Sequence, residues 1–122
     1  MATFKMNHNQ KIGKWGEQAA AEYIQNKGYS ILGKNIRTPH GEIDIIAKDG
    51  ETLVFCEVKS RRSDEFGDPE YAIPPRKQQQ IRKIARGYLF EHEIKEQDCR
   101  FDVVAIRMRG NTPEINYMRN AF

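Results

Sequence analysis

The chain has 122 residues, of which 39% are hydrophobic, and its 20 Lys and Arg against 17 Asp and Glu give a net charge of +3. This length fits one domain with its own core. No apolar run reaches the ~18–20 residues of a membrane-spanning helix. The first residues, MATFKMNHNQ, lack the apolar region of a secretory signal, so we expect a cytoplasmic protein without a membrane partner. The modest charge alone identifies no partner.

The N-terminal part predicts a tail followed by a helix. Residues 1–11 are polar and aperiodic, and we predict a flexible tail of the single domain 1–122. A helix is predicted from Lys14 to Lys27, where apolar side chains recur at helical spacing and Gly28 is placed to end it. Glu17 projects to the edge of the apolar arc. It is either a solvated acid near the helix N-terminus or an acid that faces the sheet.

Three strands are predicted to follow as an antiparallel meander. The first covers Tyr29–Arg37 and contains Gly33, which indicates a bend or a bulge. The second and third, 41–47 and 52–58, flank a Lys-Asp-Gly-Glu turn and are predicted to form a hairpin.

Acidic residues interrupt both strands of this hairpin. Asp44 lies inside the run Ile-Asp-Ile-Ile, and Glu57 and Lys59 follow the run Leu-Val-Phe-Cys. Glu57 and Lys59 project from one face because side chains alternate along a strand. A buried carboxylate is costly unless it is paired or bound to a cation. Three interpretations are therefore open: a structural ion pair, solvated acids at strand ends, or a metal site.

The metal interpretation matches the residue types. Proteins hold Mg²⁺ with one or two carboxylates while the ion keeps water and substrate oxygens as further ligands. Asp44 and Glu57 are the right type and number. Lys59, beside them, could orient or deprotonate an attacking water or neutralise charge in the transition state.

The C-terminal half predicts a second helix and two strands. A long polar segment, 60–75, reads as a loop, and an apolar stripe predicts a helix from Arg76 to about Glu93. Residues 99–106 predict a strand, in which we expect Asp102 to pair structurally with a neighbouring arginine, and 114–118 could form an edge strand. The order α-β-β-β-α-β, with this extra strand, predicts an α/β fold in which helices flank a mixed sheet.

Basic side chains follow the acids in sequence. They are Arg61, Arg62, Arg76, Lys77, Arg82, Lys83 and Arg86. Contacts from Arg and Lys to phosphates provide most of the sequence-independent affinity of proteins for DNA, so we predict binding mainly through the DNA backbone. Lys77 lies near a helix N-terminus, where a cation is disfavoured. Either its head stays in water, or its charge meets a phosphate or the acids.

These motifs resemble those of the PD-(D/E)xK nuclease superfamily, in which an acid on one hairpin strand precedes a Glu-x-Lys on the next. The chain is most similar to the bacterial YraN-like proteins, an endonuclease-like family that resembles archaeal Holliday-junction resolvases. The resemblance covers nearly the whole chain, including Gly-Glu at 16–17, Gly-Glu-Ile-Asp at 41–44, Glu-Val-Lys at 57–59 and Arg-Phe-Asp-Val-Val at 100–104. The Pro-Asp dipeptide of the superfamily is replaced by Ile43-Asp44.

The resemblance implies a restriction-endonuclease-like core and a set of roles. Asp44 and Glu57 would bind Mg²⁺ or Mn²⁺, Lys59 would be the catalytic lysine, and Glu17 would complete the site. The implied activity is metal-dependent hydrolysis of DNA phosphodiester bonds, on branched or junction DNA. A homodimer is also implied, because a junction presents two symmetric cuts. The alternative is a non-catalytic nucleic-acid-binding module that retains the nuclease fold.

Overall fold

The computed structural model describes residues 8–62 and 73–122, with side chains described for 14–61 and from 73 onwards. The elements are α1 (His8–Asn26), β1 (Ser30–Thr38), β2 (Gly41–Asp49), β3 (Thr52–Arg62), α2 (Pro75–Glu91), β4 (Cys99–Arg109) and β5 (Thr112–Met118). The predicted α/β architecture and the extra edge strand are confirmed. Within the described ranges, neither helix is both long and apolar enough to cross a membrane.

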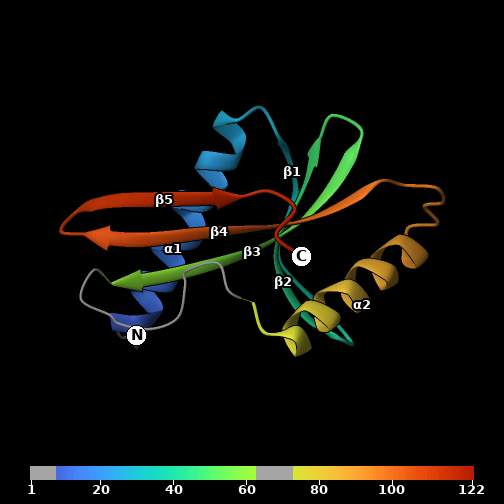
Figure 1. Ribbon diagram of the computed structural model, residues 1–122, viewed down its shortest axis with the longest axis horizontal. Coiled ribbons are helices and arrows are strands. Elements are labelled where there is room, and N and C mark those ends of the chain that lie inside the picture. The colour runs from blue at the N-terminus through green and yellow to red at the C-terminus, as the bar shows by residue number, and fades with distance from the viewer. Residues whose placement is uncertain (1–7, 63–72) are drawn as a thin grey trace, which may run out of the picture.

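The five strands form one mixed sheet in the order β1-β2-β3-β4-β5 (Figure 1). β1, β2 and β3 make the predicted antiparallel meander, β4 runs parallel to β3, and β5 returns antiparallel to β4. A parallel pair needs a crossover connection, and α2 lies within it. The pairing register of β1 shifts between Ile31 and Gly33, which confirms the irregularity predicted at this glycine.

The two helices cover opposite faces of the sheet (Figure 1). Ala20 and Ile24 of α1 pack in one core, and Ile81 and Ile84 of α2 pack in the other. Alternation along β3 supplies both cores, since Val54 joins the α1 side while Phe55 joins the α2 side. Two residues beyond Phe55, the same alternation directs Glu57 to the face of α2.

Two boundaries differ from the prediction. The helix α1 begins at His8, inside the segment predicted as a tail, because residues such as Gln and Lys extend a helix without an apolar stripe. The rest of that segment, 1–7, lies outside the described residues. β3 continues to Arg62, where a loop was predicted from Ser60, because its backbone pairs with Ile106–Met108 of β4. Arg61 and Arg62 therefore lie on a strand, and residues 63–72 of the predicted loop lie outside the described residues.

Candidate active site

The β2–β3 hairpin brings Asp44 and Glu57 together. The regular pairing of the two strands ends at Ile45 and Cys56, beyond which the strands separate. There the Asp44 Oδ2 accepts a hydrogen bond of 2.8 Å from the backbone N–H of Val58, so a side chain replaces the next backbone pair. This bond fixes the Asp44 carboxylate beside Glu57, which also shares a hydrogen bond with it. The predicted acid pair is therefore present.

Burial and mutual repulsion make this pair hard to ionise. Burial raises the pKa of the Glu57 carboxyl from 4.5 to about 7, and the charge of Asp44 is the next cause. Burial also raises the pKa of Asp44; the Val58 N–H opposes the shift and the charge of Glu17 adds to it. The Oε2 of Glu57 is buried without a hydrogen-bond partner among the described residues. The surroundings thus do not fully offset the cost of ionising both acids.

Lysines approach the pair without neutralising it. The Nζ of Lys77, on α2, lies 3.9 Å from the Oε1 of Glu57. Lys77 was predicted either to keep its head in water or to meet a phosphate or the acids, and the structure shows the contact with an acid. The charges of Lys77 and Lys59 lower the pKa of Glu57, but its pKa stays raised, so their effect is smaller than that of burial and of Asp44. A structural ion pair alone therefore explains only part of this site.

Glu17, on α1, lies within electrostatic range of the site. Its charge contributes to the raised pKa of Asp44, and of the two alternatives predicted for Glu17 this effect favours the acid that faces the sheet. The approach depends on Gly16, because a Cβ at that position would lie 1.9 Å from the Oγ of Ser60 on β3. The missing side chain of Gly16 allows α1 to pack closely against the end of β3.

The donor set fits a hard divalent cation held by two carboxylates. The orphaned Oε2 of Glu57 is a buried acceptor that a cation would satisfy, and carboxylate oxygen is the ligand that Mg²⁺ prefers. Within the described part of the chain, no three His, Cys, Asp or Glu side chains converge as a metal-binding group. Glu17 therefore does not join Asp44 and Glu57 as a third clustered ligand, and the remaining positions would fall to water and substrate oxygens.

The predicted basic residues are distributed around α2 and the end of β3. Arg61 is half-buried on β3 opposite Arg107, and the side chain of Arg62 lies outside the described residues. On α2, the exposed members are Arg76, Arg82, Lys83 and Arg86. Arg76 precedes Lys77 along the helix and the other three follow it, so one helix carries both the cation at the acid pair and the exposed cations.

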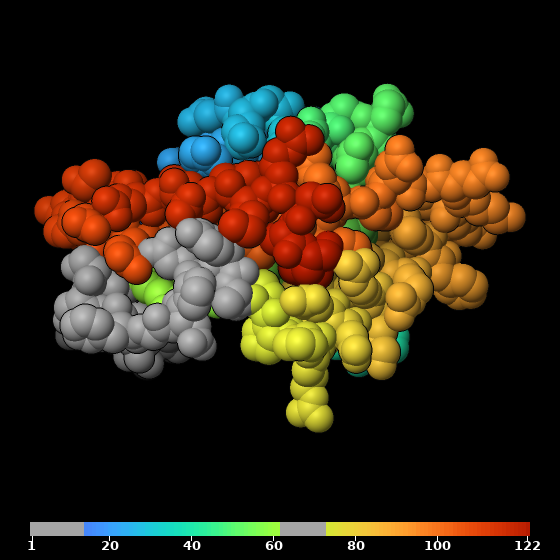
Figure 2. All heavy atoms as spheres, viewed as in Figure 1, coloured from blue at the N-terminus to red at the C-terminus, as the bar shows by residue number. Residues whose placement is uncertain are grey.

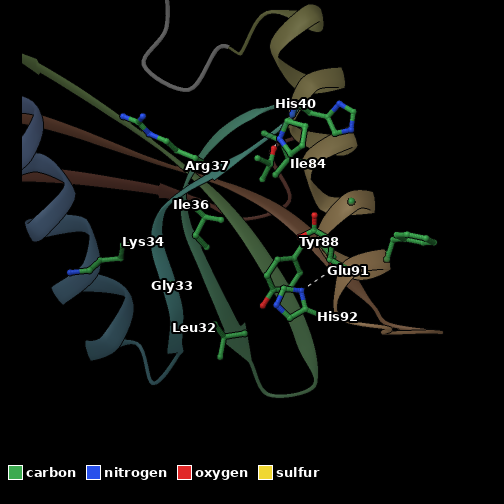
Figure 3. Close-up of a pocket in the computed structure, with 14 residues that line it drawn as sticks. Leu32, Gly33, Lys34, Ile36, Arg37, His40, Ile84, Tyr88, Glu91 and His92 are labelled. Carbon is green, nitrogen blue, oxygen red and sulfur yellow. Dashed lines mark hydrogen bonds between the residues drawn. The ribbon is translucent and has the colours of Figure 1, made fainter.

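Sequence analysis missed the contribution of the β1–β2 turn. His40 in this turn lines two hollows that border α2. One is a pocket of about 470 Å³ between β1 and α2, where Tyr88 stacks on His92 and Glu91 is the only carboxylate among the described lining residues (Figure 3). The other contains Arg76, Gln79, Gln80 and Lys83. Arg76 and Lys83 were among the predicted DNA-binding residues, but nothing local in the sequence linked them or the adjacent glutamines to His40.

Comparison with known proteins places the chain in a family. Residues 16–106 match the model described as "Uncharacterised protein family UPF0102". The chain belongs to this family. The UPF0102 protein of Syntrophus aciditrophicus is 48% identical over 98% of this chain and 94% of its own length. The UPF0102 proteins of Thermodesulfovibrio yellowstonii and Chlorobium limicola are 50% and 52% identical, over 92% and 83% of this chain and 96% and 79% of their own lengths.

Family membership confirms the YraN-like resemblance at family level. The UPF0102 match extends from α1 into β4, so it contains Glu17, Asp44, Glu57 and Lys59. The family description names no activity, and a function for this UPF0102 member has to come from the chemistry of its site.

Proposed function

We propose that this UPF0102 protein is a metal-dependent DNA endonuclease of the PD-(D/E)xK superfamily that hydrolyses phosphodiester bonds, with branched or junction DNA as the candidate substrate. The observation that carries the proposal is the adjacent, half-buried pair Asp44 and Glu57, with a buried and unsatisfied Oε2 on Glu57. Ionising both acids in this position costs free energy that a bound divalent cation would offset. The homodimer and the cytoplasmic location stay predictions.

The roles follow from the placement of the side chains. Asp44 and Glu57 would hold Mg²⁺ or Mn²⁺, which supplies an acidified water and neutralises charge on the phosphate. The Val58 N–H keeps the Asp44 carboxylate oriented. Lys59 lies close enough to lower the pKa of Glu57, and its ammonium would donate a hydrogen bond to the attacking water or to a phosphate oxygen. Glu17 adds negative charge that favours cation binding at Asp44.

Metal binding is the first test. Calorimetric titration of the wild type with Mn²⁺ and Mg²⁺ is expected to show a site that Asp44→Asn and Glu57→Ala weaken by at least about tenfold, because each removes a charged ligand. Glu114→Gln is the matched control, since that carboxylate is 53% exposed and pairs with Arg109. Equal metal affinity in all variants would exclude the proposed site.

Cleavage is the second test. Junction, flap, single-stranded and duplex DNA are incubated with Mg²⁺ and each protein. Asp44→Asn and Lys59→Ala are expected to lower the cleavage rate by about 10²–10³-fold, the usual cost of losing one charge-stabilising group. Lys95→Ala removes an exposed lysine beyond α2 as a control. Cleavage that persists unchanged in both site variants would refute the assignment, and DNA binding without any cleavage would support the non-catalytic module.

A further inference from the structure

We propose that a basic hollow on α2 binds backbone phosphates of the DNA strand whose neighbouring phosphate reaches Asp44 and Glu57. The inference rests on the proposed function and adds a second contact for the same substrate. The hollow measures about 390 Å³ and lies between α2 and the β1–β2 turn. Its described lining residues are His40, Arg76, Gln79, Gln80 and Lys83.

The lining selects an oxyanion. No carboxylate is among the described lining residues, and Arg76 and Lys83 have no ion pair within the described part of the chain. The other members are two amides and an imidazole, which can donate hydrogen bonds to oxygen. A phosphate presents several acceptor oxygens to such donors, and Arg forms its strongest contacts with phosphate and carboxylate.

The helical spacing aims both cations into the hollow. Arg76, Gln79, Gln80 and Lys83 occupy positions i, i+3, i+4 and i+7, which share one face of a helix. Lys77 is rotated away from this face and contacts Glu57. Arg76 and Lys77 are consecutive residues of α2, and they place one cation in the hollow and the next at the acid pair.

The opposite wall is fixed to α2 before any ligand binds. The Nε2 of Gln80 donates a 2.8 Å hydrogen bond to the carbonyl of His40. Gly41 permits this contact, because its φ is +130° and a Cβ there would lie 2.3 Å from the same Nε2. Within the turn, the Thr38 Oγ1 accepts a hydrogen bond of 3.1 Å from the His40 N–H. The hollow is therefore preformed, which lowers the entropic cost of binding.

The dimensions suit one DNA strand. Arg76 and Lys83 are seven residues apart, about 10 Å along the helix axis. A strand advances about 3.4 Å per nucleotide, so this face of α2 spans about three nucleotides. A strand that follows α2 would pass from the hollow to the acid pair without leaving the helix.

Arg82 belongs to a different surface. Its guanidinium lies 4.8 Å from the ring centre of Phe101 and 5.8 Å from that of Phe122. Figure 2 shows the red C-terminal residues against the yellow and orange α2 segment. We therefore expect Arg82 to contribute less to DNA affinity than Arg76 and Lys83, although all three are exposed basic residues of one helix.

The test measures DNA binding in EDTA, so that it does not depend on metal or cleavage. Fluorescence anisotropy with labelled single-stranded and junction DNA compares the wild type, Arg76→Gln/Lys83→Gln and Lys34→Gln/Lys95→Gln. Both double variants lose two exposed positive charges. The hollow variant is expected to bind at least about tenfold more weakly, with a single-strand salt slope lower by about 1.4, as two lost phosphate contacts predict. The control variant and Arg82→Gln are expected to stay within about threefold of wild type.

The outcomes separate this inference from the proposed function. Equal losses in the two double variants would show general charge attraction and overturn the hollow. Titration with inorganic phosphate distinguishes DNA phosphate from free phosphate as the ligand. If the hollow variant loses phosphate binding but keeps its DNA affinity, the hollow is a free-phosphate site and the proposal is overturned. An absence of Mg²⁺-dependent cleavage would refute the proposed nuclease activity. The binding measurement in EDTA would then still test whether the hollow binds DNA.

Discussion

The charge of Glu57 is unfavourable for the stability of the fold, although the proposed metal site requires it. The Glu57 side chain is 15% exposed and lies next to a second acid, and the Nζ of Lys77 is 3.9 Å from its Oε1. A direct charged hydrogen bond would be about 2.8 Å long, so Lys77 leaves most of the cost of ionisation in place. Fold stability alone would favour an apolar residue here, and a buried acid at such a position is typical of a functional site.

Removing this charge is expected to stabilise the metal-free protein in a pH-dependent way. The folded pKa of Glu57 is about 7 against 4.5 in the unfolded chain, so the unfolded state loses its proton first and stability falls as pH rises from 4.5 to 7. Glu57→Gln should exceed wild type by up to about 3 kcal/mol at pH 8 in EDTA, and the difference should shrink towards pH 5. Urea unfolding across this range measures it. A difference that does not change with pH would contradict the raised pKa.

At the scale of elements, the position of α1 relative to β3 depends on one small residue. A Cβ on Gly16 would lie 1.9 Å from the Oγ and 3.0 Å from the Cβ of Ser60. Gly16 precedes Glu17, and Ser60 follows Lys59. The close packing of helix on strand therefore also sets the separation between the backbone segments that carry Glu17 and Lys59.

Gly16→Ala is expected to destabilise the protein by about 1–3 kcal/mol, because the overpacking outweighs the helix propensity gained. Gly87→Ala is the matched control in α2, where the nearest side-chain atom to a Cβ is 3.9 Å away, and it should stabilise by about 0.5–1 kcal/mol. Adding Ser60→Gly to Gly16→Ala should recover part of the loss in urea unfolding. Independent, additive effects of the two substitutions would show that the clash is not the cause.

Elements with a local pattern were predictable from the sequence, and those stabilised by distant partners were not. The β2–β3 hairpin and its acids follow from alternation and turn chemistry, and the structure confirms them. The polar end of β3 was missed because its strand form depends on pairing with β4, which follows α2 in the chain. The hollow was missed for the same reason, since His40 and Gln80 are 40 residues apart.

Across the whole molecule, a buried network around Asp102 connects β2 with β4, β5 and the C-terminal segment. Asp102 is fully buried and accepts hydrogen bonds from the Arg100 Nε at 2.9 Å, the Asn120 N–H at 2.9 Å and the Tyr117 hydroxyl. Arg100 also contacts Asp49 at 2.8 Å. These contacts link β2, β4, β5 and the C-terminal segment, and they confirm Asp102 as a structural pairing residue.

Asp102→Asn is therefore expected to weaken the fold without altering the acid pair, which lies on the opposite face of the sheet. The neutral amide leaves Arg100 partly uncompensated in a buried position, at a cost of about 3–5 kcal/mol. Arg109→Gln is the control: it breaks a 2.9 Å pair with Glu114 whose side chains are 62% and 53% exposed, and it should cost less than about 1 kcal/mol. Urea unfolding compares the two, and Mn²⁺ titration of each folded variant should match wild type.

If Asp102→Asn were no less stable than Arg109→Gln, the network would be dispensable for the fold. Weakened Mn²⁺ binding in a folded Asp102→Asn variant would instead show that the two faces of the sheet are coupled.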